Sequence, residues 1–302
     1  MKYMLSQWLL IFYTYCFLGW IWECSYVSIK EKEWFNRGFL HGPLIPIYGF
    51  GAVIILWLTL PFKENILYIY FLGSLGASVL EYFTGALMEK IFKVRYWDYS
   101  NHKYNLNGHI SLFVSLGWGF FSVLLVKLLH QPIEGLVLKI PYYITEAISL
   151  ILTIVFAVDA TISIQSALDM KKLLKEIVEN NKLIVSLGLK LNDISSSLNI
   201  TMKDLNKSIL DIESDLQRKT FQYKDEVNKK FNEGILNKNE NLDELKSRLK
   251  IAEENVASLK KEAYKKAVNL LRKNPTAVSR DFKKIFQEIK SHIKSKSRKN
   301  KK

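Results

Sequence analysis

Five long apolar segments constrain this chain more than any other feature of its sequence. They cover about residues 5–22, 44–60, 66–88, 108–129 and 143–168. An α-helix rises about 1.5 Å per residue, so about 20 apolar residues cross the roughly 30 Å hydrocarbon core of a bilayer. Five such runs within 168 residues are difficult to bury in the core of a soluble protein. The sequence therefore predicts an all-α fold that begins with a five-helix transmembrane bundle over residues 1–168.

The charge distribution divides the chain into two unlike parts. Residues 1–168 carry 11 Lys and Arg against 10 Asp and Glu, a net charge of +1. Residues 169–302 carry 32 against 19, a net charge of +13. All seven Trp residues precede residue 119, and two cysteines exclude a disulfide scaffold. This split is typical of a membrane domain followed by a charged helical tail.

The first apolar segment has the length of a signal peptide but not its ending. A cleavage site needs small residues, whereas this segment continues through the bulky Trp20 and Trp22. We therefore expect a retained helix.

Basic residues beside the apolar segments predict the orientation in the membrane. Seven lie in the loops after the first and third segments: Lys30, Lys32, Arg37, Lys90, Lys93, Arg95 and Lys103. Three lie in the other two loops: Lys63, Lys127 and Lys139. Because cytoplasmic loops carry an excess of Lys and Arg, we expect the loops after the first and third segments to face the cytoplasm. The chain is then a multi-pass protein of the cell inner (plasma) membrane, with its N-terminus outside and its C-terminal tail in the cytoplasm.

Polar side chains gather at the cytoplasmic half of the predicted bundle. Glu23 ends the first helix, while Glu81 and Asp159 lie inside the third and fifth helices. A charge inside a bilayer is costly and by default suggests a functional site. The pattern favours a polar pocket open to the cytoplasm; the alternative is that each acid pairs with a loop cation or caps a helix. The candidate pocket residues are Glu23, Arg37, His41, Glu81, Asp98, Asn107 and Asp159.

Residues 37–51 combine glycine and proline where the second helix should begin. Pro43 and Pro46 remove backbone donors, and non-helical backbone at membrane depth persists only beside protein or a water-filled cavity. The segment is a candidate re-entrant element near a site. The alternative is an ordinary helix that begins at Pro43.

Catalytic and metal-binding patterns are not recognisable in this sequence. Cys16 and Cys24 share one hydrophobic helix without a neighbouring His or Cys cluster. No Ser/His/Asp or Cys/His arrangement can be assigned. We therefore expect no enzymatic activity, no cofactor and no metal.

An ordered series of motifs runs through the membrane half. It comprises GWIWE at 19–23, RGFLHGPLIPIYGFGA at 37–52, LEYFTGALMEKIF at 80–92, WDYSNHKYNLNGHISL at 97–112 and WG at 118–119. In these motifs residues 8–165 resemble the bacterial family called "putative ABC-transporter type IV". The resemblance implies an integral membrane permease component. Besides the acids, it draws attention to Gly38, Gly42, Pro43, Pro46, Tyr48, Gly49, Gly85, Trp97, Tyr99, Gly108 and Trp118.

Energy for such a permease would come from another chain. The sequence lacks the Gly-x-x-x-x-Gly-Lys-Ser/Thr phosphate loop, so ATP binding of that kind requires a separate ATPase subunit.

The WDYS segment at 97–100 allows two interpretations. Asp98 could pair with Arg37 and tie the two cytoplasmic loops together. Alternatively, Trp97 and Tyr99 form an interfacial aromatic belt and Asp98 caps a helix.

Residues 169–274 have the apolar spacing of coiled-coil helices. One seam recurs every seven residues: Ile177, Ile184, Leu191, Leu198, Leu205 and Ile212. A second seam runs from Leu242 to Ala263 after a polar break. The two helices could fold back as a hairpin or pair with another chain, either a second copy or a different partner.

Residues 275–302 form a basic, amphipathic end with a net charge of +8. Such a segment beside a membrane domain most simply binds anionic lipids of the inner leaflet. Nucleic acid is a less favoured partner, because no base-reading motif accompanies the charge.

Two functions fit these features. The leading one is a transporter permease component with a cytoplasmic polar pocket. The alternative is a membrane-anchored scaffold that works through its cytoplasmic coiled coil.

Overall fold

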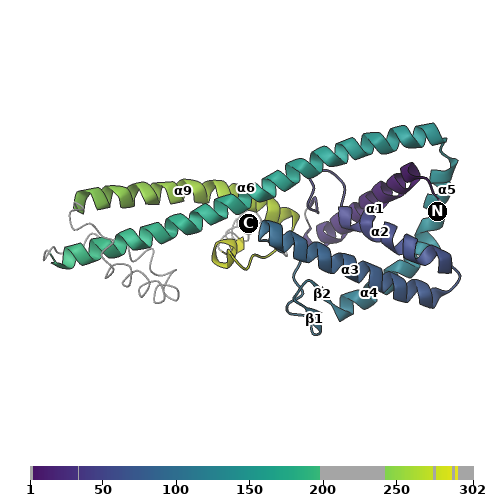
Figure 1. The fold of residues 1–302 in the computed structure, drawn as a ribbon, viewed down its shortest axis with the longest axis horizontal. Helices are drawn as coiled ribbons and strands as arrows, with labels where there is room; N and C mark the ends of the chain where they lie inside the picture. The colour runs from purple at the N-terminus through teal and green to yellow at the C-terminus, as the bar shows by residue number, and fades with distance from the viewer. Residues whose placement is uncertain (1–2, 33, 198–241, 275–276, 288–289, 292–302) are drawn as a thin grey trace. The chain divides into compact units, whose positions relative to one another are not determined.

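A computed structural model describes residues 3–32, 34–197, 242–274, 277–287 and 290–291. The chain forms two compact units. The first unit contains residues 1–171 and 264–302, and the second contains residues 172–263. Within the described ranges there are seven α-helices and one two-stranded ribbon, which confirms the all-α expectation (Figure 1).

The first unit holds the apolar helices. They are α1 (Leu5–Glu31), α2 (Pro46–Thr59), α3 (Ile66–Phe92), α4 (Leu112–Leu124), α5 (His130–Lys139) and, up to residue 171, α6 (Tyr142–Ser197). A 3-10 turn, η1 (Leu60–Phe62), extends α2, and a π-helical turn, η2 (Leu125–Leu129), joins α4 to α5. Four helical stretches are long and apolar enough to cross a membrane: Leu5–Lys30, Ile66–Phe92, Leu112–Lys139 and Tyr142–Lys190. The fifth expected helix, Pro46–Phe62, is apolar but shorter.

Two of these helices extend past the apolar segments recognised in the sequence. The fourth segment continues through η2 and α5 to Lys139, and Pro132 lies in the first turn of α5, directly after the π-helical turn. The fifth segment continues without interruption to Ser197. No Gly or Pro interrupts it where the apolar run ends, so the heptad pattern takes over within one helix.

One face of α3 displays large apolar side chains away from the protein. Phe71, Leu75, Val79, Phe83 and Leu87 recur every four residues and are all exposed. Residues four apart lie on one helix face. A continuous exposed apolar stripe of this length is what lipid contact requires, and it agrees with a membrane location.

Small residues bring the helices of the first unit close together. The most extensive contacts join α3 with α4, α2 with α3, and α1 with α2. Gly73 of α3 lies directly against the buried side chain of Ser122 in α4. Gly49 of α2 lies against Cys16 and Phe12 of α1. Close backbone approach at small residues is the usual mode of helix packing in membranes.

We expect the substitution Gly73→Ala to lower the free energy of unfolding by about 1–3 kcal/mol, because the new methyl group overlaps Ser122 and separates α3 from α4. Gly117→Ala in α4 is the matched control. No atom lies within 4 Å of a Cβ built at Gly117, so alanine should be neutral or stabilise the helix by up to about 1 kcal/mol. Thermal unfolding in detergent measures both; equal effects would contradict the packing argument.

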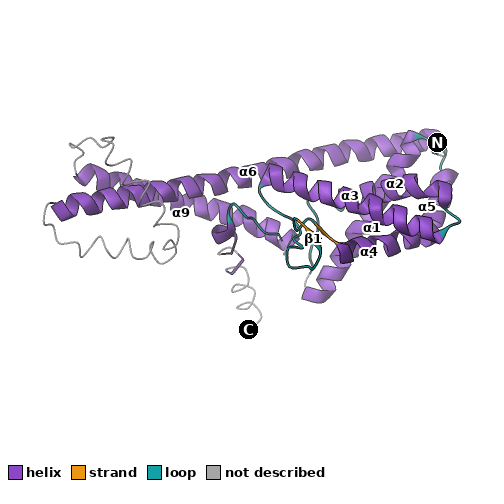
Figure 2. Cartoon of the chain, turned by 60° about the horizontal axis from the view of Figure 1, so that its bottom comes forward, coloured by secondary structure: helices purple, strands orange, loops and turns teal. Residues whose placement is uncertain are grey.

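A short β-ribbon interrupts the loop between α3 and α4. Strands β1 (Asn105–Leu106) and β2 (Ile110–Ser111) pair antiparallel, with Leu106 opposite Ile110 (Figure 2). Asn107 and Gly108 form the turn, and both have positive φ, 54° and 76°. Because Leu106 pairs with Ile110, the loop has three residues, and within it the Asn-Gly pair has the two positive φ values of a type I′ turn, closed by a 3.1 Å hydrogen bond from the His109 N–H to the Leu106 carbonyl. The sequence interpretation missed this ribbon, although the Asn-Gly dipeptide was its signal.

The second unit is a pair of helices. Residues 172–197 of α6 lie beside residues 242–263 of α9 (Leu242–Lys273), running in the opposite direction (Figure 1). Ile184 of α6 packs with Ala252, Val256 and Leu249 of α9. The hairpin alternative therefore agrees with the described residues. The predicted seam positions Leu198, Leu205 and Ile212 lie outside them, so the coiled coil stays a prediction.

Candidate functional site

Two loops of the first unit meet on one side of the apolar helices, which we call the loop side. They are residues 32–45, between α1 and α2, and residues 93–111, between α3 and α4. The Phe39 ring of the first loop contacts the Tyr96 ring of the second at 5.5 Å between centroids. The two loops therefore contact each other, as loops on one side would; that this side faces the cytoplasm stays a prediction. Most of the polar residues singled out in the sequence lie here.

Glu23 is the centre of one polar group on the loop side. It lies near the end of α1, where Oε1 accepts a hydrogen bond from the Tyr48 hydroxyl of α2 at 2.8 Å. Its other oxygen is 3.3 Å from Nη2 of Arg37. Arg37 also donates from its backbone N–H to the Cys24 sulfur at 3.2 Å. Glu23 therefore joins α1, α2 and the first loop.

Glu81 is the centre of a second polar group. Its side chain in α3 is buried, with 5% of its surface exposed. Oε1 accepts a hydrogen bond from the Tyr99 hydroxyl at 2.9 Å, and Oε2 accepts one from Nε1 of Trp118 at 2.7 Å. The Tyr48 and Trp118 rings contact each other with centroids 6.3 Å apart. The two acids are thus linked through aromatic residues, and we call Glu23, Arg37, Tyr48, Glu81, Tyr99 and Trp118 the aromatic–acid network.

Asp159 has a different environment from the other two acids. Oδ1 accepts from the backbone N–H of His41 at 2.9 Å, and Oδ2 accepts from that of Gly42 at 2.7 Å. Ser163, one turn later in α6, donates to Oδ1 at 3.2 Å. Asp159 therefore holds the first loop against α6. These contacts match the alternative in which an acid stabilises the fold, and they do not join Asp159 to Glu23 or Glu81.

A buried arginine organises the second loop. The Arg95 side chain is only 2% exposed; its Nε is 2.7 Å from Glu89 Oε1, and its Nη1 is 3.2 Å from Asp98 Oδ1. Glu89 also lies 3.2 Å from Nε2 of His109. Of the two interpretations of the WDYS segment, the one that pairs Asp98 with Arg37 is wrong, because Asp98 contacts Arg95 and Arg37 contacts Glu23. The sequence interpretation counted Arg95 only among the basic residues that predict membrane orientation. It therefore missed the ion pairs of Arg95 with Glu89 and Asp98.

The electrostatic environment of the second loop shifts two pKa values. Burial alone would raise the pKa of Asp98, but hydrogen bonds from Ser100 and the charge of Arg95 outweigh it, so the pKa is lowered. Burial and the nearby Arg95 lower the pKa of His109, although Glu89 acts in the opposite direction. The arrangement therefore favours an ionised Asp98 and a neutral His109.

Several of the predicted motif residues support the second loop. Trp97 donates from Nε1 to the His109 carbonyl at 3.0 Å, and Gly85 leaves room for both of these side chains. Asn107 donates to the Tyr82 hydroxyl at 3.2 Å. At Gly108 a Cβ would meet Arg95 Nη1 at 2.5 Å. These residues therefore shape the second loop.

The C-terminal segment of the first unit is attached to both loops. Lys273 donates to the Leu40 carbonyl at 3.2 Å, and Arg37 donates to the Lys273 carbonyl at 2.6 Å. Beyond α9, Arg95 and Val278 exchange two backbone hydrogen bonds of 2.7 and 2.9 Å. Ala277 and Phe286 are buried. Part of the basic segment expected to lie on lipid therefore packs against protein; its end, from residue 292, lies outside the described residues.

A further polar cluster at the opposite end of the bundle escaped the sequence interpretation. His130 is buried; its Nε2 is 3.0 Å from the Tyr3 hydroxyl, and its Nδ1 is 3.4 Å from the Tyr15 hydroxyl. Tyr3 donates to Glu134 at 2.8 Å. The cluster follows directly after the π-helical turn, a feature often found near functional sites.

Metal binding finds no support in the part of the chain that the structure describes. These residues contain no group of three or more His, Cys, Asp or Glu side chains that could hold an ion.

Comparison with known proteins gave one match. A family model described as "Putative ABC-transporter type IV" matches residues 10–164, about half of the chain and nearly all of its apolar helices. Comparisons with curated proteins and with solved structures gave no match.

Proposed function

Because the chain belongs to the "putative ABC-transporter type IV" family, we propose that it is the membrane-spanning permease component of a transporter. The observation that carries this proposal is the aromatic–acid network. It joins α1, α2, α3 and α4 and both loops through Glu23 and Glu81. Placing two carboxylates within the membrane-spanning region costs free energy, so their presence there suggests a functional site.

The network acts as a gate in this proposal. Every oxygen of Glu23 and Glu81 has a protein partner, which corresponds to a closed state. A substrate that offers donors of its own would displace Tyr48, Tyr99 or Trp118 and open a polar pocket between the helices. Its two acceptor carboxylates favour a cationic or donor-rich substrate.

The orientation and partner follow from the same proposal. The two loops of the loop side carry an excess of basic residues, which supports an orientation in which this side of the inner membrane faces the cytoplasm. The N-terminus then lies outside. A separate ATPase subunit supplies the energy from that side, and this chain itself catalyses no reaction. The basic residues beyond 291 bind anionic lipids of the inner leaflet.

A scaffold function is the second candidate, and the paired helices of the second unit favour it. Their packing around Ile184 and Val256 provides a stable rod that a second copy or another coiled-coil protein could recognise. In that case the residues of the aromatic–acid network only stabilise the fold.

Gentle purification from native membranes distinguishes the two functions. We expect a stoichiometric ATP-binding subunit among the copurifying chains, and ATP hydrolysis by the resulting complex in liposomes. Deletion of residues 172–263 should leave that subunit bound. Loss of function on this deletion, together with no ATP-binding subunit in the intact complex, would instead support the scaffold. The measurements are mass spectrometry of the complex and its ATP turnover.

A further inference from the structure

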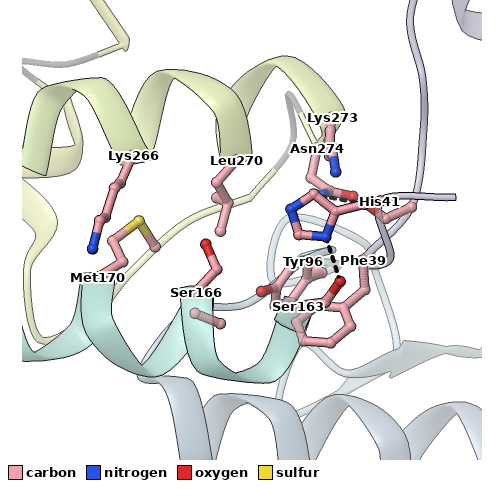
Figure 3. Close-up of a pocket in the computed structure, with 12 residues that line it drawn as sticks. Phe39, His41, Tyr96, Ser163, Ser166, Met170, Lys266, Leu270, Lys273 and Asn274 are labelled. Atoms are coloured by element: carbon pink, nitrogen blue, oxygen red, sulfur yellow. Dashed lines mark hydrogen bonds between the residues drawn. The ribbon is translucent and has the colours of Figure 1, made fainter. Parts of the chain in front are cut away.

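A small pocket lies between four segments of the first unit. Its walls are the first loop at Gly38–His41, Tyr96 of the second loop, the α6 turns from Ser163 to Met170, and the last turns of α9 from Lys266 with Asn274 just beyond them (Figure 3). Its volume is about 60 Å³. This is room for a few water molecules or one small polyatomic ion, and too little for a nucleotide.

The lining of this pocket combines hydrogen-bond donors with apolar side chains, among them Phe39, Met170 and Leu270. Of the donors, Lys266 and Lys273 come from α9, His41 from the first loop, and Ser163 and Ser166 from α6. Figure 3 shows Lys273 and Asn274 beside His41 at one end and Lys266 beside Met170 at the other. No Asp or Glu stands among the described lining residues. Two acids contact residues of the lining. Asp159 accepts from the loop backbone and lies 3.4 Å from Nδ1 of His41. Asp169 lies 3.4 Å from the Lys266 ammonium.

Lys273 is the strongest indication of an anionic ligand. Its ammonium donates to the Leu40 carbonyl at 3.2 Å, which uses one of its three donor hydrogens. Among the described residues no carboxylate lies within 4.0 Å of it. Burial lowers the pKa of Lys273, although the charge of Asp159 acts in the opposite direction. An anion in the pocket would place a negative charge closer to this partly buried ammonium.

We propose that this pocket binds a phosphate group. Lysine ammonium groups and hydroxyl donors are common phosphate ligands, and the volume suits one tetrahedral oxyanion. Free phosphate and the headgroup of an anionic phospholipid offer the same chemistry. The position of the pocket favours the phospholipid headgroup. The pocket adjoins the stretch of α6 where exposed apolar residues such as Ile162 and Ile164 are followed by Lys171 and Lys172. The proposal does not depend on the transport function.

Binding at this site would have a mechanical consequence. The pocket joins the first loop, which carries Arg37, to α6 and α9. A bound phosphate would bridge Lys273 to the loop and strengthen this attachment. We therefore expect ligand binding to stabilise the folded chain in proportion to its concentration above Kd.

The test uses the full-length protein in detergent, with inorganic phosphate as the probe and sodium chloride of equal ionic strength as the reference for screening. Wild type should show a phosphate-dependent rise in Tm and saturable binding in the millimolar range or tighter. Lys273→Met should weaken binding about tenfold or more, the loss of roughly 1.4 kcal/mol of interaction. Lys265→Met, an exposed lysine of the same helix outside the pocket, should bind like wild type.

A lipid arm separates the two sources of phosphate. Nanodiscs with phosphatidic acid are compared with nanodiscs of phosphatidylcholine alone, and native mass spectrometry counts the lipid retained. Retention that depends on Lys273, without binding of inorganic phosphate, assigns the site to a headgroup. If Lys273→Met does not fold, Lys266→Met and Lys273→Arg are measured instead; Lys266→Met should weaken binding and Lys273→Arg should preserve it. Equal binding by Lys265→Met and the pocket variants, or no binding of either probe by wild type, overturns the proposal.

Discussion

Glu81→Gln is expected to lower the ATP turnover of the reconstituted transporter complex at least about tenfold, equivalent to roughly 1.4 kcal/mol or more, while the chain stays folded. The reason lies in the two partners of this carboxylate. Trp118 Nε1 can only donate, but the Tyr99 hydroxyl can donate or accept. A glutamine can therefore accept from Trp118 through its oxygen and donate to Tyr99 through its amide. The substitution removes the charge and keeps both hydrogen bonds.

Two further variants separate charge from folding at this position. Glu81→Leu leaves the partly buried donors of Tyr99 and Trp118 without this acceptor and should lower the free energy of unfolding by about 1–3 kcal/mol. Glu146→Gln neutralises an exposed acid of α6 outside the network and should leave turnover unchanged. Thermal unfolding and ATP turnover are measured for all three variants. Full turnover by Glu81→Gln would reduce the aromatic–acid network to a structural role.

The sequence predicted the acids of the loop side because their signal is local. A glutamate inside an apolar run is visible without any structure, and Glu23 and Glu81 do lie in one network. Asp159 also lies inside an apolar run, but its carboxylate accepts hydrogen bonds from the backbone of the first loop. The difference depends on which backbone donors lie opposite the side chain. That is a property of packing between α6 and the loop, which apolar periodicity does not encode.

The contacts of the C-terminal segment could not be read from local patterns. Val278 pairs with Arg95 through the backbone, and Asn274 donates to the Gly38 carbonyl at 3.3 Å. Backbone pairing between distant segments leaves no trace in side-chain spacing. The positive charge of the segment instead suggested a lipid surface. The Asn107–Gly108 hairpin was different: its signal was present, but the apolar segments around it drew attention to helices alone.

Arg95→Met is expected to lower the free energy of unfolding by about 3 kcal/mol at neutral pH, because removing one member of a buried ion pair leaves its partners uncompensated. The partners here are Glu89 and Asp98, both only partly exposed. Lys90→Met, an exposed lysine one residue after Glu89, is the control and should change stability by less than about 0.5 kcal/mol. Chemical unfolding in mixed micelles measures both. Similar effects of the two substitutions would contradict the central role of Arg95.

The pH dependence of this variant provides an independent check. The pKa of Asp98 in the folded chain is lowered, so its contribution to stability is fully present above its ordinary pKa and is lost as the pH falls through the folded value. Arg95→Met has no guanidinium to favour the ionised form of Asp98. Protonation of Asp98 at low pH therefore removes less of the free energy of unfolding from the variant than from wild type. Wild type should therefore lose more stability than the variant as the pH falls below about 4, and the gap between them should narrow. A gap that stays constant through this range would show that packing, and not charge, accounts for the effect of Arg95.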